Sequence, residues 1–301
     1  VAQRVMVLRD GTVAGVVGAA EVSRREIVSM MVGRDIERDE KAARDEAVQR
    51  ATDPASTPPA LEVSNLSRSR AFEGVSFAVH PGEAVGLFGL LGAGHLAVTR
   101  AIFGAEPADE GEIRIHGSLV SIASPRQAAR RGIGLVAEDR KTDGLVPAMS
   151  VADNLVLSHW PGVASAGVVS LRRQQQKAKE WVGRMGVRLK SGVRQPIATL
   201  SGGNQQKVLL ARWLEAGVRI LLLNEPTRGV DVGARADIYA LLDELRRKGL
   251  AVVVCSSDLE EVLEVSDRIL VFAKGKLVAE FDRGQADQVG VLAAATGQDN
   301  P

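Results

Sequence analysis

The chain has 301 residues, of which 45% are hydrophobic and 25% charged, a composition typical of a globular protein with an ample core. The formal net charge of +1 and the 3% aromatic content argue against a general affinity for nucleic acid or membrane surfaces. A single cysteine, Cys255, excludes an internal disulfide, and the apolar runs are shorter than the roughly 18 residues of a membrane-spanning helix. Because Cys255 follows the apolar run Ala251–Val254, we expect a buried thiol in a reducing compartment.

The beginning of the chain reads as a β-hairpin over 4–14 that turns at Asp10-Gly11. Residues 268–278 repeat this pattern, and three pairs share an offset of 264 residues: Gly11 with Gly275, Gly33 with Gly297, and Asp35 with Asp299. A constant register over some 30 residues predicts an internal repeat, the alternative being two hairpins that are alike by chance. Residues 1–36 would then be the C-terminal tail of a preceding, truncated unit of a longer tandem protein.

Residues 37–60 are charged and then rich in Pro, Ser and Thr, which predicts a linker. The main unit, 61–301, opens with two alternating segments of an antiparallel sheet, 61–65 and 75–79. A buried strand over 84–88 leads into the glycine-rich loop Gly89-Leu-Leu-Gly92-Ala93-Gly94, and a helix follows through Ile102. This loop has the glycine frame of the phosphate-binding pattern GxxxxGK[ST], but His95 and Leu96 occupy the last two places.

The middle of the chain continues with β-rich residues 112–115 and 119–122, a short basic helix capped by Ser124, and a core strand over 133–136. A charged loop with Glu138, Asp139 and Arg140 comes next. Residues 148–199 carry a helical pattern without strand signals, with helices expected over 150–159 and 171–185; in the second, Gln and Lys should face outward and Trp181 and Met185 inward.

The turn Ser201-Gly202-Gly203 begins an amphipathic helix, and Ser201 is the expected N-cap. The two glycines and the positive end of the helix dipole suit a phosphate group. After this helix, the buried-type strand over 219–223 ends at the polar pair Asn224 and Glu225, a place where α/β proteins put ligand chemistry. The remaining expected elements are a helix over 235–248, a strand over 251–255, a short helix over 262–266 and the hairpin over 268–278.

This order of parts resembles the ATP-binding subunit of an ABC transporter. LSGGNQQ, residues 200–206, matches the signature motif of that family, and LLLNEP, residues 221–226, matches its Walker B strand, with Gly229-Val230-Asp231 following. The run from Ser124-Pro125 through the 138–141 sequence EDRK to Asp143-Gly144-Leu145 is similar to the second ATP-binding half of tandem monosaccharide importer subunits. The resemblance implies an α/β P-loop NTPase fold with a RecA-like core, an antiparallel β subdomain, and a helical subdomain over about 148–213.

In that family, the phosphate loop and Walker B of one unit hold ATP and Mg²⁺ while the signature helix of the other unit closes over the γ-phosphate. The first set of residues is degenerate here. His95 stands for the family's Lys, Leu96 for Ser or Thr, Asn224 for the Mg²⁺-binding Asp, Glu138 for Gln and Ser257 for the switch His. Only Glu225, the expected water-orienting carboxylate, is retained, so we expect little hydrolysis at this unit's own loop and no metal-ligand set. His95 is either a substitute phosphate ligand or a solvent-exposed or merely packed side chain.

The second set is complete: Ser201, Gly202, Gly203, Asn204, Gln205 and Asp231. We therefore predict a degenerate half that donates its signature to the ATP site of a partner half. The family often stacks adenine on an aromatic residue, but the stretch from Ser67 to Ala71 has none, and Phe72 is expected in the core.

The resemblance implies membrane permease subunits as partners and, indirectly, a periplasmic or extracellular solute-binding protein. It places the chain at the cytoplasmic side of the cell membrane as a peripheral subunit. Three alternatives stay open: an importer of nucleosides or another small solute, a structural or regulatory pseudo-ATPase, and a soluble ABC protein that acts on DNA or ribosomes. The third would be expected to carry basic arms or long coiled coils, and neither is evident, so no nucleic-acid partner is predicted.

Overall fold

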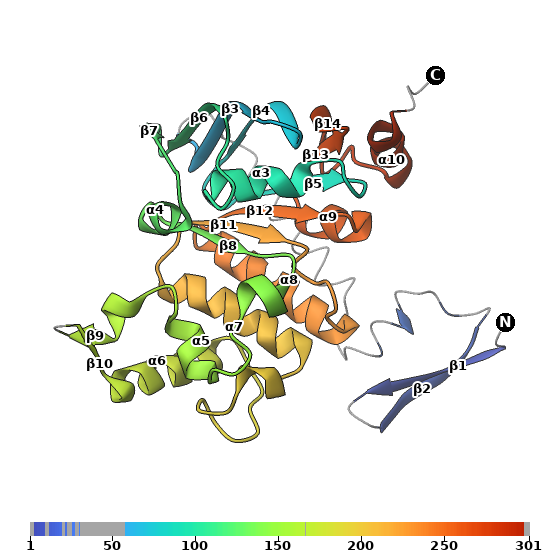
Figure 1. Cartoon of the computed structure of the whole chain (residues 1–301). Coiled ribbons are helices and arrows are strands. Elements are labelled where there is room, and N and C mark those ends of the chain that lie inside the picture. Colours follow the sequence, from blue (N-terminus) through green and yellow to red (C-terminus); the bar gives the residue numbers. More distant parts are fainter. Residues whose placement is uncertain are drawn as a thin grey trace.

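The computed structural model describes residues 3–9, 12–19, 58–165 and 167–297, together with residues 22, 26, 27 and 30. Within this part, the main unit is built on a six-stranded sheet of order β14-β13-β5-β12-β11-β8 and a four-stranded sheet of order β4-β3-β6-β7 (Figure 1). The expected linker over 37–60 lies almost wholly outside the described residues.

The six-stranded sheet is the core of the molecule. Its strands are β5 (Ala84–Gly89), β8 (Ile133–Val136), β11 (Ile220–Asn224), β12 (Ala251–Ser256), β13 (Arg268–Ala273) and β14 (Lys276–Asp282). All neighbours are parallel except β13 and β14, which form the expected hairpin. The strands β5, β11 and β12 are buried along their whole length, which explains their continuous apolar sequence.

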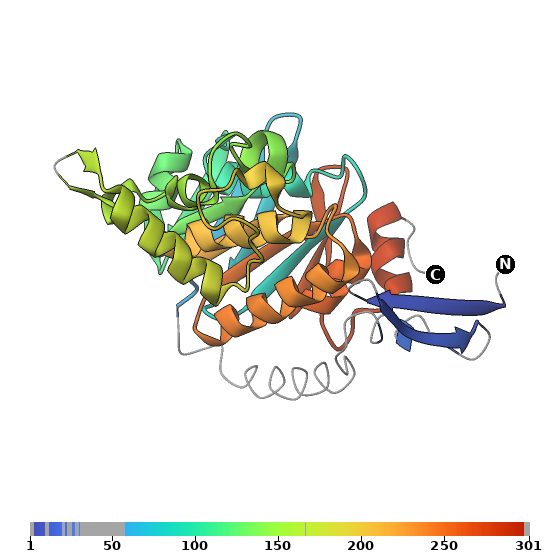
Figure 2. The same cartoon turned by 90° about the horizontal axis from the view of Figure 1, so that it is seen from below.

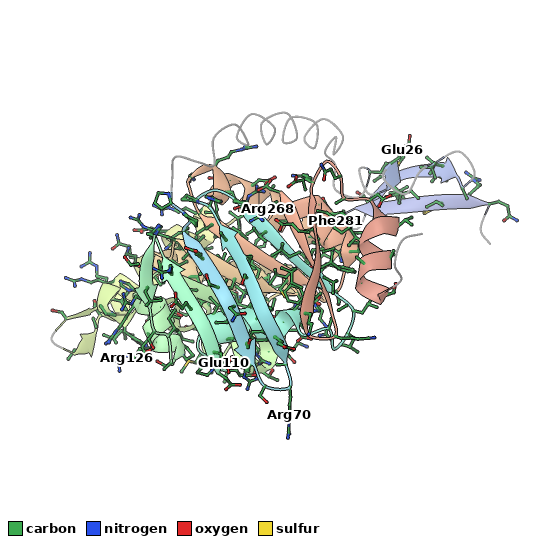
Figure 3. All side chains as sticks on the ribbon, turned by 90° about the horizontal axis from the view of Figure 1, so that it is seen from above. Glu26, Arg70, Glu110, Arg126, Arg268 and Phe281 are labelled. Carbon is green, nitrogen blue, oxygen red and sulfur yellow. The ribbon has the colours of Figure 1, made fainter. Side chains whose placement is uncertain are left out.

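The four-stranded sheet is antiparallel throughout and consists of β3 (Leu61–Arg68), β4 (Phe72–Val79), β6 (Glu110–Ile115) and β7 (Ser118–Val120). Arg70, in the turn between β3 and β4, projects from one end of this sheet (Figure 3). Phe72 is only 4% exposed, which confirms its place in the core.

Helix α3 (His95–Ile102) contacts β4 of the antiparallel sheet and β5, β11 and β12 of the core sheet, so it lies between the two (Figure 1). Helices α7 (Gly202–Glu215) and α8 (Val232–Arg247) pack against each other on the opposite side of the core sheet. The remaining helices of the main unit outside the helical subdomain are α4 (Pro125–Arg130), α9 (Leu259–Val265) and α10 (Gln288–Thr296).

The helical subdomain contains α5 (Val151–Val156) and α6 (Leu171–Arg184), which pack against each other and against α7 (Figure 2). Arg212 of α7 stabilises this packing, because its buried guanidinium donates hydrogen bonds to the carbonyl oxygens of Asn154 and Gly144 at 2.6 Å each. Burial lowers the pKa of Arg212 to about 10.

Two expectations for this region, and one for α4 outside it, were wrong in detail. A small hairpin, β9 (Ala164–Ser165) and β10 (Val168–Val169), interrupts the segment in which only helices were expected. Gln174 of α6 points inward, because its amide donates to Asp153 Oδ1 at 2.8 Å. Ser124 precedes α4 as expected but its side chain makes no capping hydrogen bond within the described chain.

The N-terminal hairpin, β1 (Arg4–Arg9) with β2 (Thr12–Gly18), was expected; its turn residues lie outside the described ones. Its strand register repeats that of β13 and β14. Val7 pairs with Gly15 and, after an irregularity, Leu8 pairs with Val13. At the offset of 264, Val271 pairs with Ala279 and, after the same irregularity, Phe272 pairs with Leu277. Gly33, Asp35 and Asp299, which share the offset in the sequence, lie outside the described residues.

Candidate functional site

The glycine-rich loop joins β5 to α3 and has the conformation that its sequence requires. Gly92 and Gly94 adopt left-handed φ angles of 82° and 94°. A Cβ on Gly94 would lie 2.4 Å from the Ala71 carbonyl oxygen, so that glycine is also needed for packing against the β3–β4 turn. The Ala93 carbonyl oxygen accepts a hydrogen bond from Gly275 N at 3.0 Å, which ties the loop to the β13–β14 turn.

His95 occupies the place of the phosphate-binding lysine and is buried beside the loop, with an exposed fraction of 2%. Its Nδ1 lies 2.8 Å from the point where a Cβ on Gly89 would stand. Neither ring nitrogen has a hydrogen-bond partner among the described residues. Burial lowers the pKa of His95 from 6.5 to about 4, opposed in part by the charge of Glu225, so the ring is neutral at pH 7. The ring is therefore packed beside the loop and is not solvent-exposed.

Asn224 ends β11 at the position of the expected Mg²⁺-binding carboxylate. It is 2% exposed, and its Oδ1 accepts a hydrogen bond from the hydroxyl of Thr99 at 2.7 Å. Thr99 lies on α3, one turn beyond Leu96. The sequence analysis did not single out Thr99, although a polar residue on the inner face of a short apolar helix was a usable signal.

The three substituted positions of the usual ATP and Mg²⁺ motif do not fit the metal here. Mg²⁺ prefers carboxylate and hydroxyl oxygens, whereas these positions offer a neutral imidazole, the aliphatic Leu96, and an amide whose oxygen is already bonded to Thr99. The motif carboxylate that remains at this edge is Glu225. The described residues contain no group of three or more His, Cys, Asp or Glu side chains that could hold a metal ion.

Glu225 follows Asn224 in a left-handed conformation with φ of 48°, an unusual value for this residue type and one that is common at functional sites. Its carboxylate is fixed by Ser257, whose backbone N–H and hydroxyl both donate to Oε1 at 2.8 Å. Ser256 Oγ donates to Oε2 at 3.2 Å. Ser257, at the switch-histidine position, therefore contacts the carboxylate directly.

A second carboxylate, that of Glu261 on α9, is buried near Glu225 and was missed by the sequence analysis. It is 1% exposed and accepts hydrogen bonds from Thr227 Oγ1 at 2.6 Å and Tyr239 Oη at 3.2 Å. Burial raises the pKa of Glu261, with a smaller contribution from the charge of Glu225, while hydrogen bonds from surrounding hydroxyl groups oppose the increase. Cys255 is buried as expected, and burial likewise raises the pKa of its thiol.

The signature residues stand at the start of α7, where Ser201 is exposed and Gly203 and Gln205 are buried. Ser201 is at the N-cap position, but its side chain makes no capping hydrogen bond within the described chain; its hydroxyl accepts from Asn204 Nδ2 at 2.8 Å. The expected capping bond was therefore wrong, although the position was right. Asn204 Oδ1 in turn accepts from Arg188 N at 2.8 Å. No side chain caps α7 within the described chain, and the same holds for α3 after the glycine-rich loop. An uncapped helix N-terminus suits an anion.

Close packing fixes the two signature glycines. A Cβ on Gly203 would lie 2.4 Å from the Cβ of Ala234 on α8, so α7 and α8 meet at this residue. A Cβ on Gly202 would lie 2.7 Å from the Gly229 carbonyl oxygen. Asp231, in the loop after β11, is exposed and caps α8 by accepting from Ala234 N at 2.9 Å.

The expected site residues thus form two separate groups. Gly89, His95, Asn224, Glu225 and Ser257 gather at the carboxyl ends of β5, β11 and β12, and Glu138 follows β8 at the same edge. Glu138 forms an ion pair with Arg228. Gln205 bonds instead to the Ile197 and Leu200 carbonyl oxygens, at 3.3 and 3.2 Å, and belongs to the signature group.

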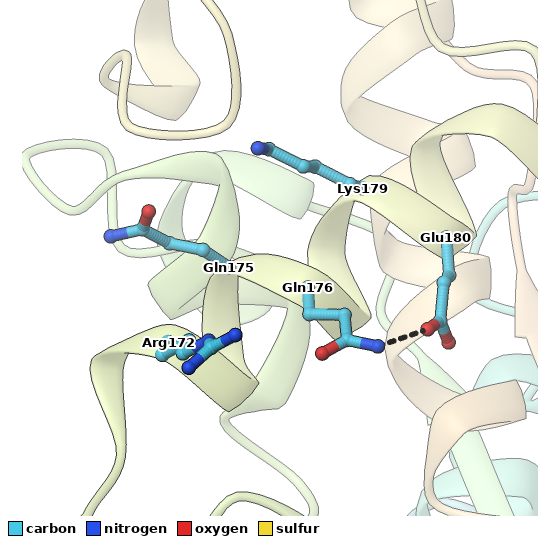
Figure 4. A pocket seen from close by; sticks show the side chains of 5 residues that line it. All are labelled: Arg172, Gln175, Gln176, Lys179 and Glu180. Atoms are coloured by element: carbon cyan, nitrogen blue, oxygen red, sulfur yellow. Dashed lines mark hydrogen bonds between the residues drawn. The ribbon is translucent and has the colours of Figure 1, made fainter.

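A hollow of about 540 Å³ lies elsewhere, on helix α6, lined by Arg172, Gln175, Gln176, Lys179 and Glu180 (Figure 4). All five side chains come from successive turns of one helix, and Gln176 donates to Glu180 at 3.3 Å. A hollow with a wall from a single helix does not enclose a ligand, so it is not a candidate site.

Comparison with known proteins identifies the architecture. Residues 72–228 match the family model described as ABC transporter. The structure aligns with that of a nucleotide-free ATP-binding cassette from an ABC transporter, with a TM-score of 0.65 and 21% sequence identity. The alignment covers 78% of this chain and 95% of that chain. A cassette solved as a dimer with ADP and phosphate gives a TM-score of 0.64 with 23% identity, over 74% of this chain and 98% of that one. These likenesses establish the expected P-loop NTPase fold.

Curated relatives are more similar in sequence. The chain is 45% identical over 300 residues to a ribose import ATP-binding protein of Streptomyces avermitilis, which covers 99% of this chain and 55% of that protein. It is 42% identical over 301 residues to a putative ribose/galactose/methyl galactoside import ATP-binding protein of Burkholderia lata, which covers 100% of this chain and 57% of that protein. The chain therefore spans a little over half the length of these relatives. Among the described residues, no helix combines the length and apolar character needed to cross a bilayer.

Proposed function

Since this chain belongs to the ABC transporter family, we propose that it forms part of the energy-coupling ATP-binding subunit of an importer for monosaccharides. The relatives named for ribose and galactose import support the substrate class. In this proposal the subunit binds to membrane permease subunits at the cytoplasmic face and depends indirectly on a solute-binding protein outside.

The chain corresponds, in our proposal, to the second half of a tandem subunit. Residues 1–36 would be the tail of the first half, residues 37–60 the linker, and residues 61–301 the second ATP-binding domain. Two observations support this: the relatives are longer than the chain, and the N-terminal hairpin repeats the register of β13 and β14, including its irregularity. Two hairpins that are alike by chance would not be expected to share both the offset and the position of that irregularity.

We further propose a division of labour between the halves. The observation that carries it is a contrast in burial. His95 and Asn224, at the key positions of the phosphate loop and Walker B, are both 2% exposed, whereas Ser201 at the start of the signature helix is exposed. This half would donate Ser201, Gly202 and Gly203 to an ATP and Mg²⁺ site on the first half. Its own Glu225 would have no metal-bound nucleotide to act on.

The first test is equilibrium binding of ATP to the chain with and without Mg²⁺. Because the donor set does not fit the metal, we expect Mg²⁺ to change the affinity less than about twofold. The variant His95→Lys/Leu96→Ser/Asn224→Asp restores the usual donors and should show stronger binding with Mg²⁺ by about tenfold or more. Strong Mg²⁺-dependent binding by the unchanged chain would contradict the proposed division.

The substrate class is tested separately, by uptake into vesicles that contain the full-length protein and its permease, in the presence of the solute-binding protein. Ribose or galactose should stimulate ATP turnover and accumulate in the vesicles, and nucleosides should not compete. Stimulation by nucleosides alone would replace the sugar assignment with the nucleoside alternative. Stimulation by neither class would favour a pseudo-ATPase or a soluble ABC protein.

A further inference from the structure

The loop after β8 approaches the signature helix through one side chain, Arg140. Asp139 shapes this loop by accepting hydrogen bonds from the backbone N–H groups of Lys141 at 2.8 Å and Thr142 at 3.3 Å. These backbone hydrogen bonds lower the pKa of Asp139, so the loop keeps its cap through the neutral range. Arg140 begins the short helical turn Arg140–Gly144, and its side chain leaves that turn toward α7.

The guanidinium of Arg140 joins three segments of the chain. Nη1 donates to the Arg228 carbonyl oxygen at 2.6 Å, and Nη2 donates to the Gly229 carbonyl oxygen at 2.9 Å. Nε donates to Gln205 Oε1, on the first turn of α7, at 3.3 Å. The bonded residues are 65 to 89 positions away in the sequence, so each bond fixes tertiary structure.

The absence of a side chain on Gly202 makes room for this arrangement. A Cβ on that residue would lie 2.6 Å from Nη2 of Arg140. The guanidinium therefore lies between the start of α7 and the turn at Gly229. Gly229 is two residues before Asp231. Gln205 extends the connection, because its amide donates to the Ile197 and Leu200 carbonyl oxygens just before Ser201.

We infer that Arg140 is a positioning residue, which holds the start of α7 and the turn before Asp231 as one preorganised surface for the nucleotide of the partner half. This inference rests on the proposed function. A fixed orientation of the N–H groups at Ser201 to Gly203 lowers the cost of ordering them when the sites close. The planar fork of arginine supplies three donors in fixed directions, which a lysine ammonium cannot reproduce.

The test uses the full-length protein assembled with its permease. Arg140→Ala should lower kcat for ATP roughly tenfold and leave KM within about twofold, because the lost bonds act on closure rather than on binding. Arg140→Lys should retain part of the activity. The matched control is Arg114→Ala, which removes an exposed guanidinium paired with Glu112 at 3.0 Å on the antiparallel sheet and should leave kcat unchanged.

Two further measurements separate positioning from a general loss of stability. Amide hydrogen exchange in the chain should become faster at 202–204 and 229–231 in Arg140→Ala and remain unchanged in the core strands. In a Ser201→Ala background, the effect of Arg140→Ala on kcat should shrink, because both changes act on the same surface. Full additivity of the two changes, or faster exchange throughout the core, would overturn the inference.

The outcomes also distinguish the inference from the function on which it rests. If Ser201→Arg abolishes turnover while Arg140→Ala leaves kcat and local exchange unchanged, the positioning role is wrong and the proposed function stands. If Ser201→Arg itself leaves turnover unchanged, the proposed donation of the signature fails first.

Discussion

The phosphate loop and the signature form the two ends of the candidate site, and they differ in the burial of their polar side chains. At the phosphate loop, His95, Thr99 and Asn224 are all at most 2% exposed, and Thr99 and Asn224 satisfy each other by a hydrogen bond. At the signature, Ser201 is exposed and the first N–H groups of α7 are left without a side-chain cap. His95, Thr99 and Asn224, the closed end, are thus covered by the protein, whereas Ser201, the open end, is accessible to a group from outside.

The two ends are therefore under separate physical constraints within one fold. The glycines of the phosphate loop are needed for turns and close packing even without a ligand, as Gly94 shows by its contact with the Ala71 carbonyl. The frame of the loop can therefore persist after its charged residues are gone. Helix α7, like α3, forgoes the stabilisation of about 1 kcal/mol that a capping side chain usually gives.

The largest expected effect is a dependence of folding stability on pH, caused by His95 at the closed end. The pKa of His95 is about 4 in the folded chain and 6.5 in the unfolded chain, so the unfolded state binds more protons between these values. Stability is therefore complete above about pH 6.5 and decreases by about 3 kcal/mol as the pH falls through 4.

Urea unfolding at about pH 7.5 and about pH 5 measures this effect, with an expected decrease of about 2 kcal/mol. The variant His95→Leu serves as the control, because other titrating groups such as Glu261 contribute equally to both proteins. Equal pH dependence in the two proteins would mean that His95 is not buried as described, and the closed end would have to be reconsidered.

The next effect concerns the packing beneath the open end. Gly203→Ala places a methyl group against the Cβ of Ala234, so it should cost about 1–3 kcal/mol of stability and lower turnover in the assembled transporter. Gly183→Ala, in the exposed part of α6, adds a methyl group that meets no described atom within 4 Å apart from its chain neighbours and the helix backbone, so it should instead stabilise by up to about 1 kcal/mol. Thermal unfolding of both variants checks the contrast.

A smaller effect on stability is expected at the closed end, from loss of the hydrogen bond between Thr99 and Asn224. Thr99→Val removes the hydroxyl that donates to Asn224 at 2.7 Å and leaves a buried amide oxygen unsatisfied, at a cost of about 1–2 kcal/mol. Thr296→Val, at the exposed end of α10, should change stability by less than about 0.5 kcal/mol in the same urea titration. If Thr99→Val is as mild as this control, the Thr99–Asn224 bond does not seal the site.

The smallest effect is predicted for Ser257→Ala. It removes one of the hydroxyl groups that hold Glu225, but the backbone N–H of residue 257 keeps its own bond to the carboxylate. Because this half is not expected to hydrolyse ATP, turnover of the assembled transporter should stay within about twofold. A loss of tenfold or more would indicate that Glu225 works as a catalytic residue at this half's own site.

The sequence predicted most of the core, because buried parallel strands and alternating antiparallel strands carry strong local patterns. The strand over 133–136 and the end of α3 at Ile102 are found where they were expected. The small β9–β10 hairpin was missed because strands of two residues leave no periodicity. The inward orientation of Gln174 was missed because its partner, Asp153, lies on another helix.

For the candidate site, the sequence identified the substitutions at 95, 96 and 224 but not their consequences. The burial of His95 and the Thr99–Asn224 bond depend on how α3 packs against β11, which no local pattern encodes. The same holds for Arg140 and Glu261, whose partners are distant in the chain. Ser201 was recognised as the start of α7, but the direction of its hydroxyl required the position of Asn204.

The measurement that tests the account most directly is ATP turnover of the full-length protein, assembled with its permease, with and without Ser201→Arg. The control is Ser118→Arg, which makes the same change at an exposed serine of β7. We predict that turnover collapses in Ser201→Arg and is unchanged in Ser118→Arg. Equal turnover in both variants would contradict the donation of this signature to a partner site and would favour a structural role for the chain.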